Sequence, residues 1–265
     1  MIIVCGMVWC PFSLTQRQEG FSIEKSGWGA AATPTMVSAT TFELSGLPIL
    51  IRRCAECLIK QYLQTYGQGP IYSEMWEEAL AGIQKHLVAT TKHSNLKSIA
   101  GLPQGVDGKL SPKMDHLVCF LPGSIAISAT ESRTEAEARQ LPSWNAKKEE
   151  QMKLAKKLMK TCWAMYAVAE SGLSPEIAWF EADPSDLEPG PASRPQTRIS
   201  DDLSSWKKDF IIKPLDAHNL QRTETVESLF LMFRVTNDPI YRKWGRFSTH
   251  SKSTCWFPMG RDTRP

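Results

Sequence analysis

Helical periodicity is the feature that most constrains the fold of this chain. Over residues 148–170, apolar side chains recur at helical spacing and lysines lie opposite them, which predicts an amphipathic helix with Leu158, Cys162 and Met165 facing inward. Segments 55–65 and 71–90 show the same spacing, and a Gly- and Pro-containing break separates them. We therefore predict a helical hairpin and a long helix within an all-α fold.

Shorter elements are predicted between these helices. The stretch 96–110 is rich in glycine and predicts a small β-hairpin or an irregular loop. Residues 111–128 are almost wholly apolar and predict a buried helix. The proline-rich stretch 181–209 predicts a long surface excursion, and 209–214 predicts a short strand after it.

Polar residues beside these elements are candidates for a site. Asp115 and His116 open the apolar helix, either as a helix cap beside a satisfied core histidine or as a polar cluster at the mouth of a cavity. Glu176 follows a predicted helix end marked by Gly172, where a working acid and a solvated acid are both common.

Two acids stand three positions apart at the start of another predicted helix. Glu224 and Glu227 follow Arg222, and an amphipathic pattern continues behind them. The acids either favour the positive end of the helix dipole on a surface helix or belong to a functional site. The apolar stripe expected to face the core consists of Val226, Leu229, Phe230 and Phe233.

Seven cysteines give little support for a metal site. Their number is odd, and Cys54-Ala-Glu-Cys57 is an isolated CxxC that argues weakly for zinc or redox chemistry. Cys119 and Cys162 lie in apolar helical segments, either as reduced core thiols or as a disulfide. Such a bond would be worth about 4 kcal/mol by the loop-entropy relation.

Charge and hydropathy exclude some classes of partner. The 31 basic and 28 acidic residues nearly balance, and no basic run is interleaved with aromatics, so we expect no nucleic-acid surface. The apolar N-terminal stretch lacks a basic start and is too short to span a bilayer, so we expect neither a signal peptide nor a transmembrane segment.

Four strings together resemble one family. They are MDHLVCFLPG, AESGLSPEI, KPLDAHNLQRTETVESLF and FRVTNDPIYRKWG, and they resemble class I α-mannosidases, glycoside hydrolase family 47. The resemblance implies a partial (αα)7 barrel of paired helices with small β-hairpins over 55–245. Atypical segments, 1–54 and 246–265, flank this domain.

The resemblance implies hydrolysis of terminal α-1,2-linked mannose from high-mannose N-glycans, by a calcium-dependent inverting mechanism. Inversion requires a water between two carboxyl groups about 6.5–9.5 Å apart. Glu224 matches the water-activating acid, and Glu176 matches a second active-site carboxylate. Residues matching the sugar and calcium end of the cavity are Asp115, His116, Arg222 and Glu227, the last a possible calcium contact through water.

The resemblance also implies that Cys119 and Cys162 are the family's disulfide. Such a bond indicates an origin in the secretory pathway, with the lumen of the endoplasmic reticulum or Golgi as the expected location.

Departures from the family pattern limit this prediction. The family's first acid and its calcium-binding threonine have no counterpart, and Leu50 and Arg52 stand where the family has an Arg-x-Asp element. We therefore interpret the sequence as a truncated or mis-spliced reading of a mannosidase gene. The first hypothesis is a glycosidase of N-glycan trimming, and the alternative is a catalytically inactive fragment or a residual high-mannose glycan-binding protein; a third interpretation is a helical interaction scaffold. For this chain we expect no hydrolytic activity, because the residues for protonation of the leaving group and for calcium capture are missing.

Overall fold

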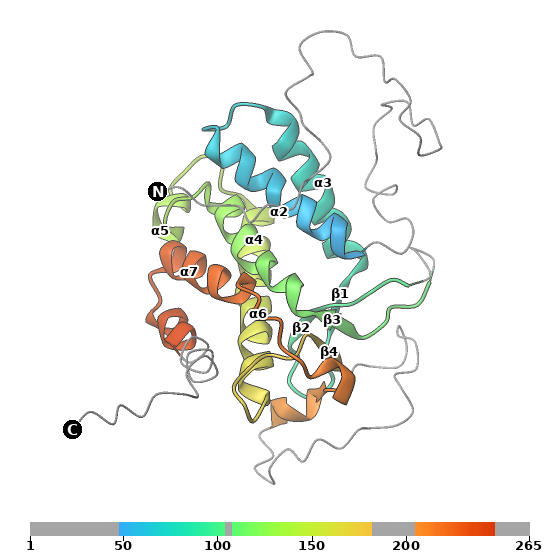
Figure 1. Ribbon diagram of the computed structural model, residues 1–265. Helices are drawn as coiled ribbons and strands as arrows, with labels where there is room; N and C mark the ends of the chain where they lie inside the picture. The colour runs from blue at the N-terminus through green and yellow to red at the C-terminus, as the bar shows by residue number, and fades with distance from the viewer. Residues whose placement is uncertain (1–47, 104–107, 182–204, 247–265) are drawn as a thin grey trace, which may run out of the picture. The chain divides into compact units, whose positions relative to one another are not determined.

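The computed structural model describes residues 48–103, 108–181 and 205–246 (Figure 1). Its longer helices are α2 (Pro48–Gln64), α3 (Pro70–His86), α4 (Leu121–Thr130), α6 (Ala146–Val168) and α7 (Glu224–Thr236). Shorter elements are α5 (Glu135–Ala138) and the 3-10 helices η2 (His116–Phe120), η3 (Ser205–Asp209) and η4 (Pro214–Asp216). The strands are β1 (Val88–Thr90), β2 (Lys97–Ile99), β3 (Lys113–Asp115), β4 (Ile177–Phe180) and β5 (Phe210–Ile211). Most of the predicted flanks, 1–54 and 246–265, and most of the predicted excursion 181–209 lie outside the described residues.

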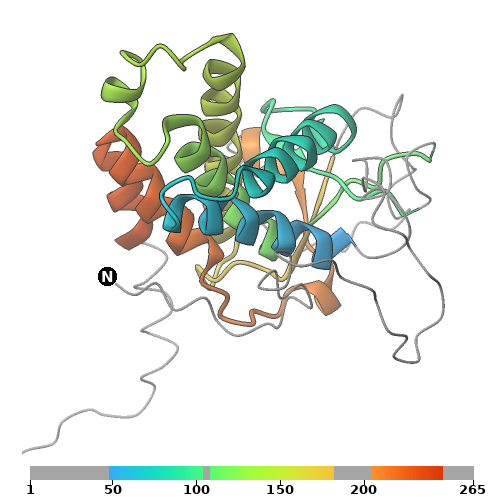
Figure 2. The same cartoon turned by 90° about the horizontal axis from the view of Figure 1, so that it is seen from above.

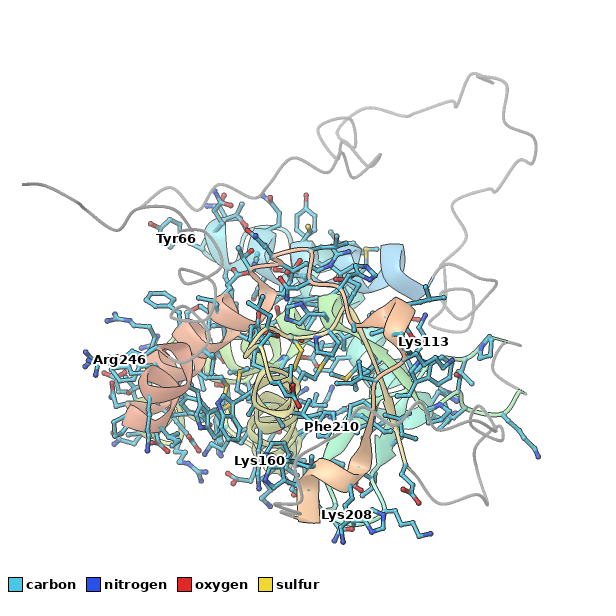
Figure 3. All side chains as sticks on the ribbon, turned by 60° about the horizontal axis from the view of Figure 1, so that its bottom comes forward. Tyr66, Lys113, Lys160, Lys208, Phe210 and Arg246 are labelled. Atoms are coloured by element: carbon cyan, nitrogen blue, oxygen red, sulfur yellow. A yellow bond between two sulfur atoms is a disulfide. The ribbon has the colours of Figure 1, made fainter. Side chains whose placement is uncertain are left out.

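The predicted helical hairpin is confirmed as α2 and α3, which lie side by side (Figures 1 and 2). The turn between them uses left-handed backbone at Gly67 (φ 80°) and Gly69 (φ 88°), which glycine adopts at little cost. Tyr66 of this turn is 96% exposed and projects from the ribbon in Figure 3. Helix α3 begins at Pro70, where the missing N–H would have had no helical acceptor.

The predicted extension of the second helix to residue 90 is wrong. Helix α3 ends at His86, and strand β1 follows, paired antiparallel with β2 in the register Val88↔Ile99 and Thr90↔Lys97. This pairing satisfies backbone groups through a neighbouring strand, so tertiary context overrides the helical periodicity.

Helix α4 lies at the centre of the core, packed against α6 and α7 (Figure 1). Nearly all of its side chains are buried, including Ile125 and Ala126. The predicted long helix is confirmed as α6, whose first turn is capped by the Asn145 side chain, which accepts a hydrogen bond from the Lys148 N–H at 3.1 Å. Leu158 of α6 is buried against this core, as predicted.

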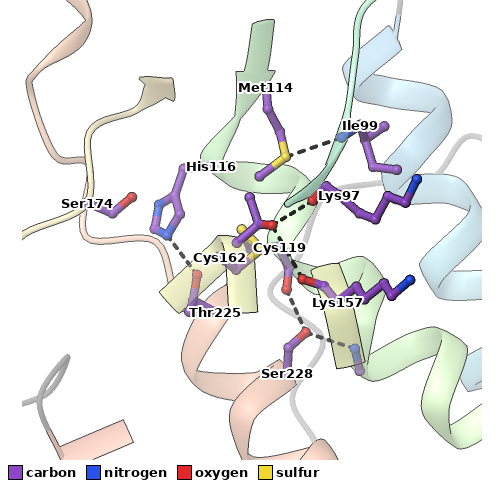
Figure 4. Close-up of a disulfide and its surroundings, with 12 residues drawn as sticks. Lys97, Ile99, Met114, His116, Cys119, Lys157, Cys162, Ser174, Thr225 and Ser228 are labelled. Carbon is purple, nitrogen blue, oxygen red and sulfur yellow. Dashed lines mark hydrogen bonds between the residues drawn. A yellow bond between two sulfur atoms is a disulfide. The ribbon is translucent and has the colours of Figure 1, made fainter. Parts of the chain in front are cut away.

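A disulfide joins Cys119 of η2 to Cys162 of α6, with an S–S distance of 2.15 Å (Figure 4). The pairing implied by the family resemblance is thereby confirmed, and the alternative of two reduced thiols is wrong. Both cysteines are buried in the core cluster.

The segment 111–128 is not one helix. It divides into strand β3, the 3-10 helix η2 and α4, whose first turn contains Pro122. The division arises because β3 pairs with β4, in the register Met114↔Ala178. The backbone N–H and C=O groups of residues 113–115 are therefore used in pairing with a strand remote in the chain, so they are not available for helical hydrogen bonds.

The second sheet is three-stranded, with the antiparallel order β3-β4-β5. Strand β5 confirms the strand predicted over 209–214. The sheet differs from the predicted small hairpins because its strands come from segments far apart in the chain. The fold is therefore mostly helical with small sheets, not all-α.

The carboxylate of Asp209 fixes the loop after β1 to the end of η3. It accepts hydrogen bonds from the Thr91 hydroxyl (2.8 Å), the His93 N–H (2.8 Å) and the Ser94 N–H (2.9 Å). Because Asp209 is fully buried, these donors compensate for the loss of its hydration.

Helix α7 begins at Glu224 as predicted, but the predicted apolar stripe is wrong in part. Phe230 is 49% exposed. The buried face consists of Thr225, Ser228, Leu229, Met232 and Val235. Small and polar side chains face the core because α7 approaches α4 closely: a Cβ added to Gly123 would lie 2.9 Å from the Ser228 Cα.

The Ser228 hydroxyl bonds across this close contact. It accepts a hydrogen bond from the Gly123 N–H at 3.1 Å and donates one to the Cys119 carbonyl at 2.6 Å (Figure 4). These bonds hold the start of α7 beside η2 and α4, so the first turn of α7 has a defined position.

Beyond α7, residues 239–246 form a further helix. Trp244 of this helix stacks on Trp163 of α6, with ring centroids 4.8 Å apart and an interplanar angle of 12°. Tyr241 is buried, and burial raises the pKa of its phenol to about 12.

Candidate functional site

The first turn of α7 carries the two predicted acids. Glu224 is its first residue, and Glu227 follows one turn later, with its N–H bonded to the Thr223 carbonyl at 2.9 Å. The chain enters the helix through Gln221, which has left-handed backbone (φ 55°). The positive end of the helix dipole favours acids at both positions.

Glu176 and Arg222 form a direct ion pair. The Arg222 Nε–H donates to Glu176 Oε1 at 2.6 Å, and the Glu176 residue is only 8% exposed. Its second oxygen, Oε2, is buried and has no hydrogen-bond partner among the described residues. The pair therefore presents an oriented carboxylate with an unused acceptor.

Backbone hydrogen bonds fix Glu176 from both sides. Its N–H is shared between the carbonyls of Asp216 (3.0 Å) and His218 (2.9 Å), and its carbonyl accepts from the His116 N–H at 2.8 Å. Glu176 directly precedes strand β4, so the prediction of an open loop position beside a helix end is replaced by a buried position at a sheet end.

His116 connects this region to α7. Its side chain is fully buried, and its Nε2 lies 2.9 Å from the Thr225 hydroxyl (Figure 4). The ring also meets the Tyr166 ring edge-on, with centroids 5.4 Å apart. A buried imidazole with hydroxyl and aromatic neighbours thus contacts the residue that follows Glu224.

Tyr166 is part of the same polar cluster. Burial raises the pKa of its phenol, the charge of Glu224 raises it further, and a hydrogen bond with Thr225 opposes both effects. The phenol therefore stays neutral and able to donate a hydrogen bond at physiological pH.

Asp115 occupies strand β3 next to this cluster, not a helix cap. Its carboxylate pairs with Lys113 at 3.3 Å, and its side chain makes no capping hydrogen bond to η2. Its backbone neighbour across the sheet is Ile177, the residue after Glu176. Asp115 is therefore close in the fold to Glu176, while His116 turns toward α7.

Sequence reasoning missed two residues that complete the cluster. Lys60 of α2 donates to Glu227 Oε1 at 2.5 Å and also to Glu56 Oε1, so one ammonium bridges two helices. The spacing of Glu56 and Lys60, four apart on a predicted helix, was the available signal, but it is equally typical of a surface ion pair.

The pKa values in this bridge reflect burial and charge. Burial raises the pKa of Glu56, and the charges of Glu227 and Glu224 add to the rise while Lys60 opposes it. Burial lowers the pKa of Lys60, but hydrogen bonds to Glu227 and Glu56 outweigh it, so the pKa is raised overall. The Lys60 ammonium is therefore retained.

The site has the composition of a surface that binds hydroxyl groups. From several elements of the fold it brings together carboxylates, a guanidinium, an ammonium, a buried imidazole and hydroxyls, all of which can donate to or accept from hydroxyls. Among the described residues, no group of three His, Cys, Asp or Glu side chains is arranged to hold a metal ion. None of the helices in those ranges has both the length and the hydrophobicity that a bilayer crossing requires.

Comparison with known proteins identifies relatives of this chain. The profile of Glycosyl hydrolase family 47 matches residues 54–256. The mannosyl-oligosaccharide 1,2-alpha-mannosidase of Candida albicans is 47% identical over 191 residues, covering 72% of this chain and 30% of the relative. The endoplasmic reticulum mannosyl-oligosaccharide 1,2-alpha-mannosidase of Schizosaccharomyces pombe is 40% identical over 190 residues, covering 72% and 32%. The chain thus spans about a third of the length of these relatives.

A solved structure has the same fold over part of its length. The alpha-1,2-mannosidase from Trichoderma reesei matches with a TM-score of 0.56 and 19% identity, covering 74% of this chain and 36% of that structure. The mostly helical fold therefore corresponds to part of that mannosidase.

Proposed function

Because the chain belongs to glycosyl hydrolase family 47, we propose that its function is the removal of terminal α-1,2-linked mannose from high-mannose N-glycans by inverting hydrolysis. The similar proteins of Candida albicans and Schizosaccharomyces pombe carry the name 1,2-alpha-mannosidase. The endoplasmic reticulum named for several relatives, together with the disulfide, supports action in the secretory pathway.

The placement of Glu224 carries this proposal. It opens α7 next to Thr225, which bonds the buried His116, and His116 bonds in turn to the backbone of Glu176. In the proposed reaction, Glu224 accepts a proton from the water that attacks the anomeric carbon, and the departing oxygen takes up a proton from solvent. The face of the sugar opposite the leaving oxygen would therefore lie toward the first turn of α7.

The other predicted residues would orient the sugar. Glu176 has a buried acceptor oxygen and is held by Arg222, so it can fix a sugar hydroxyl at a defined angle. His116 contacts the Thr225 hydroxyl, one residue after Glu224, and Asp115 lies at the adjoining strand end.

The calcium implied by the family does not fit the described residues. Among them no three candidate ligands converge, and Glu227 already contacts the Lys60 ammonium at 2.5 Å. In the family's reaction, calcium would supply charge that holds the released sugar.

A specific observation supports a second candidate, which is glycan binding without hydrolysis. Lys60 holds Glu56 and Glu227, and Arg222 holds Glu176. Carboxylates held in fixed positions by cations can still accept hydrogen bonds from sugar hydroxyls, so this arrangement favours sugar binding.

One experiment separates the two candidates. The purified 265-residue chain is mixed with α-1,2-mannobiose, release of mannose is followed by chromatography and its anomer by NMR, and binding is measured by calorimetry. Hydrolysis predicts β-mannose as the first product and its loss in Glu224→Gln, with Glu150→Gln of the exposed face of α6 as the matched control. Binding without release supports the second candidate, and the absence of both contradicts the two proposals together.

A further inference from the structure

Lys60 links α2 to α7, two helices that both pack on α4 and η2. Helix α2 packs in addition on α3, and α7 packs in addition on α6. Lys60 of α2 reaches Glu227 of α7 at 2.5 Å, across 167 positions of the chain. The side chains of Lys60 and Glu227 are 18% and 32% exposed, so this contact is partly removed from water.

The same ammonium also balances a second acid. Glu56 lies one turn before Lys60 on α2, and its side chain is 15% exposed. Without Lys60, the carboxylates of Glu56 and Glu227 would face one another with no cation between them. The two negative charges would then repel each other. Because the Glu227 side chain is more exposed than that of Glu56, we expect Glu227 to be the one that moves away.

We propose that Lys60 is a positioning residue of the sugar site: its ammonium draws Glu227 toward Glu56 and so fixes the first turn of α7, on which Glu224 lies. This inference rests on the proposed function, because the site it serves is the proposed mannose site. Lys60 acts through Glu227 and does not itself contact the reacting atoms.

Other anchors of α7 leave its Glu227 side to be held by this bridge. Thr225 and Ser228 hold α7 from its buried face, through His116 and the close contact with α4. Glu227 lies on a neighbouring face of the same turn and is only partly buried. Lys60 supplies a contact on that face, so the turn is tied to the rest of the fold there as well.

The test compares binding of α-1,2-mannobiose to four variants of the full chain. Lys60→Met removes the charge and keeps the side-chain length, and we expect about a tenfold loss of affinity, since a charge-assisted hydrogen bond is lost at the site. Lys60→Arg keeps a cation that can bridge both acids, and we expect it to recover most of the affinity. Lys156→Met, which removes a lysine–glutamate pair between α6 and α5, is the control and should bind as the unaltered chain does.

The double variant Lys60→Met with Glu56→Gln serves if the single variant does not fold. It removes the cation and the acid behind it together, which leaves less uncompensated charge in the protein. We expect it to fold and still to bind several-fold more weakly than the unaltered chain, because Glu227 remains untethered.

Different results would refute the role of Lys60 and the proposed function. If the unaltered chain binds and Lys60→Met or the double variant binds equally well, the role of Lys60 is refuted while the proposed function stands. Weaker binding without recovery in Lys60→Arg also refutes it, because a structural defect would explain the loss. If the unaltered chain does not bind α-1,2-mannobiose, the proposed function fails and the inference fails with it.

Discussion

Replacing Gly123 by alanine tests how closely α4 and α7 pack beneath the proposed site. The added methyl carbon would lie 2.9 Å from three atoms: the Ser228 Cα, the Ser228 Oγ and a terminal methyl of Leu231. Carbon atoms in contact prefer separations of about 3.5–4.0 Å. Leu231 can change rotamer, but the Ser228 Cα is backbone and moves only if α7 moves.

The substitution has two opposing effects on the free energy of unfolding. Alanine has a higher helix propensity than glycine by about 1 kcal/mol. Overpacking of a tight contact costs about 1–3 kcal/mol. If α7 moves away from α4 to make room, the hydrogen bond from the Gly123 N–H to the Ser228 hydroxyl also becomes longer. We therefore expect Gly123→Ala to lower the free energy of unfolding by about 2 kcal/mol.

The assay is urea denaturation followed by circular dichroism, with Gly245→Ala as the matched control. A Cβ at Gly245 would meet no atom within 4 Å, so we expect that variant to be neutral or slightly more stable. Affinity for α-1,2-mannobiose should also fall in Gly123→Ala, because α7 carries Glu224. Gly123→Ala that is as stable as Gly245→Ala would refute the close packing of α4 and α7.

Three further predictions concern other parts of the fold. Asp209→Ala should lower the free energy of unfolding by about 3 kcal/mol, because it leaves three donors without their acceptor; a loss below about 1 kcal/mol in urea denaturation would contradict this anchor. Replacing Cys119 and Cys162 together by alanine should cost about 4 kcal/mol, and thermal unfolding that is unchanged by the replacement would argue against the bond. Burial raises the pKa of Glu56 in the folded state, so its protonated form stabilises the fold below about pH 4.5, and that contribution is lost as the pH rises through the folded-state pKa. Glu56→Gln should remove this decline from the pH dependence of urea denaturation, and an unaltered profile would contradict it.

Residue spacing alone predicts those helices that pack on the core along a regular apolar face. The hairpin α2–α3 and the helix α6 follow from residue spacing, and the start of α7 at Glu224 follows from its acids and their position. The Cys119–Cys162 bond needed the family resemblance, because spacing alone left two alternatives open.

Tertiary contacts decided the features that the sequence did not predict. Phe230 is exposed because α7 turns its small residues toward Gly123, and the close approach of two backbones leaves no mark in a hydrophobic pattern. Strand β3 forms within an apolar segment because β4, remote in the chain, supplies its hydrogen-bond partners. Pairings of this kind depend on the whole fold.

The same reason explains what was missed at the site. Residue spacing places Glu56 beside Lys60, but it cannot place Lys60 against Glu227. The ion pair of Glu176 and Arg222 likewise joins residues 46 positions apart. The candidate acids and Arg222 could be named from the sequence, whereas Lys60 and the pairing of each cation with its acid depend on the folded structure.

Binding of α-1,2-mannobiose to the purified 265-residue chain tests whether the cluster around Glu176 and Glu224 is a mannose site. Calorimetric titration should show saturable binding that Arg222→Met weakens by about tenfold, since that change releases the Glu176 carboxylate, while Arg139→Met on an exposed pair should leave it unchanged. The absence of saturable binding to the unaltered chain, or equal binding by Arg222→Met, would contradict the assignment of this cluster as a mannose site.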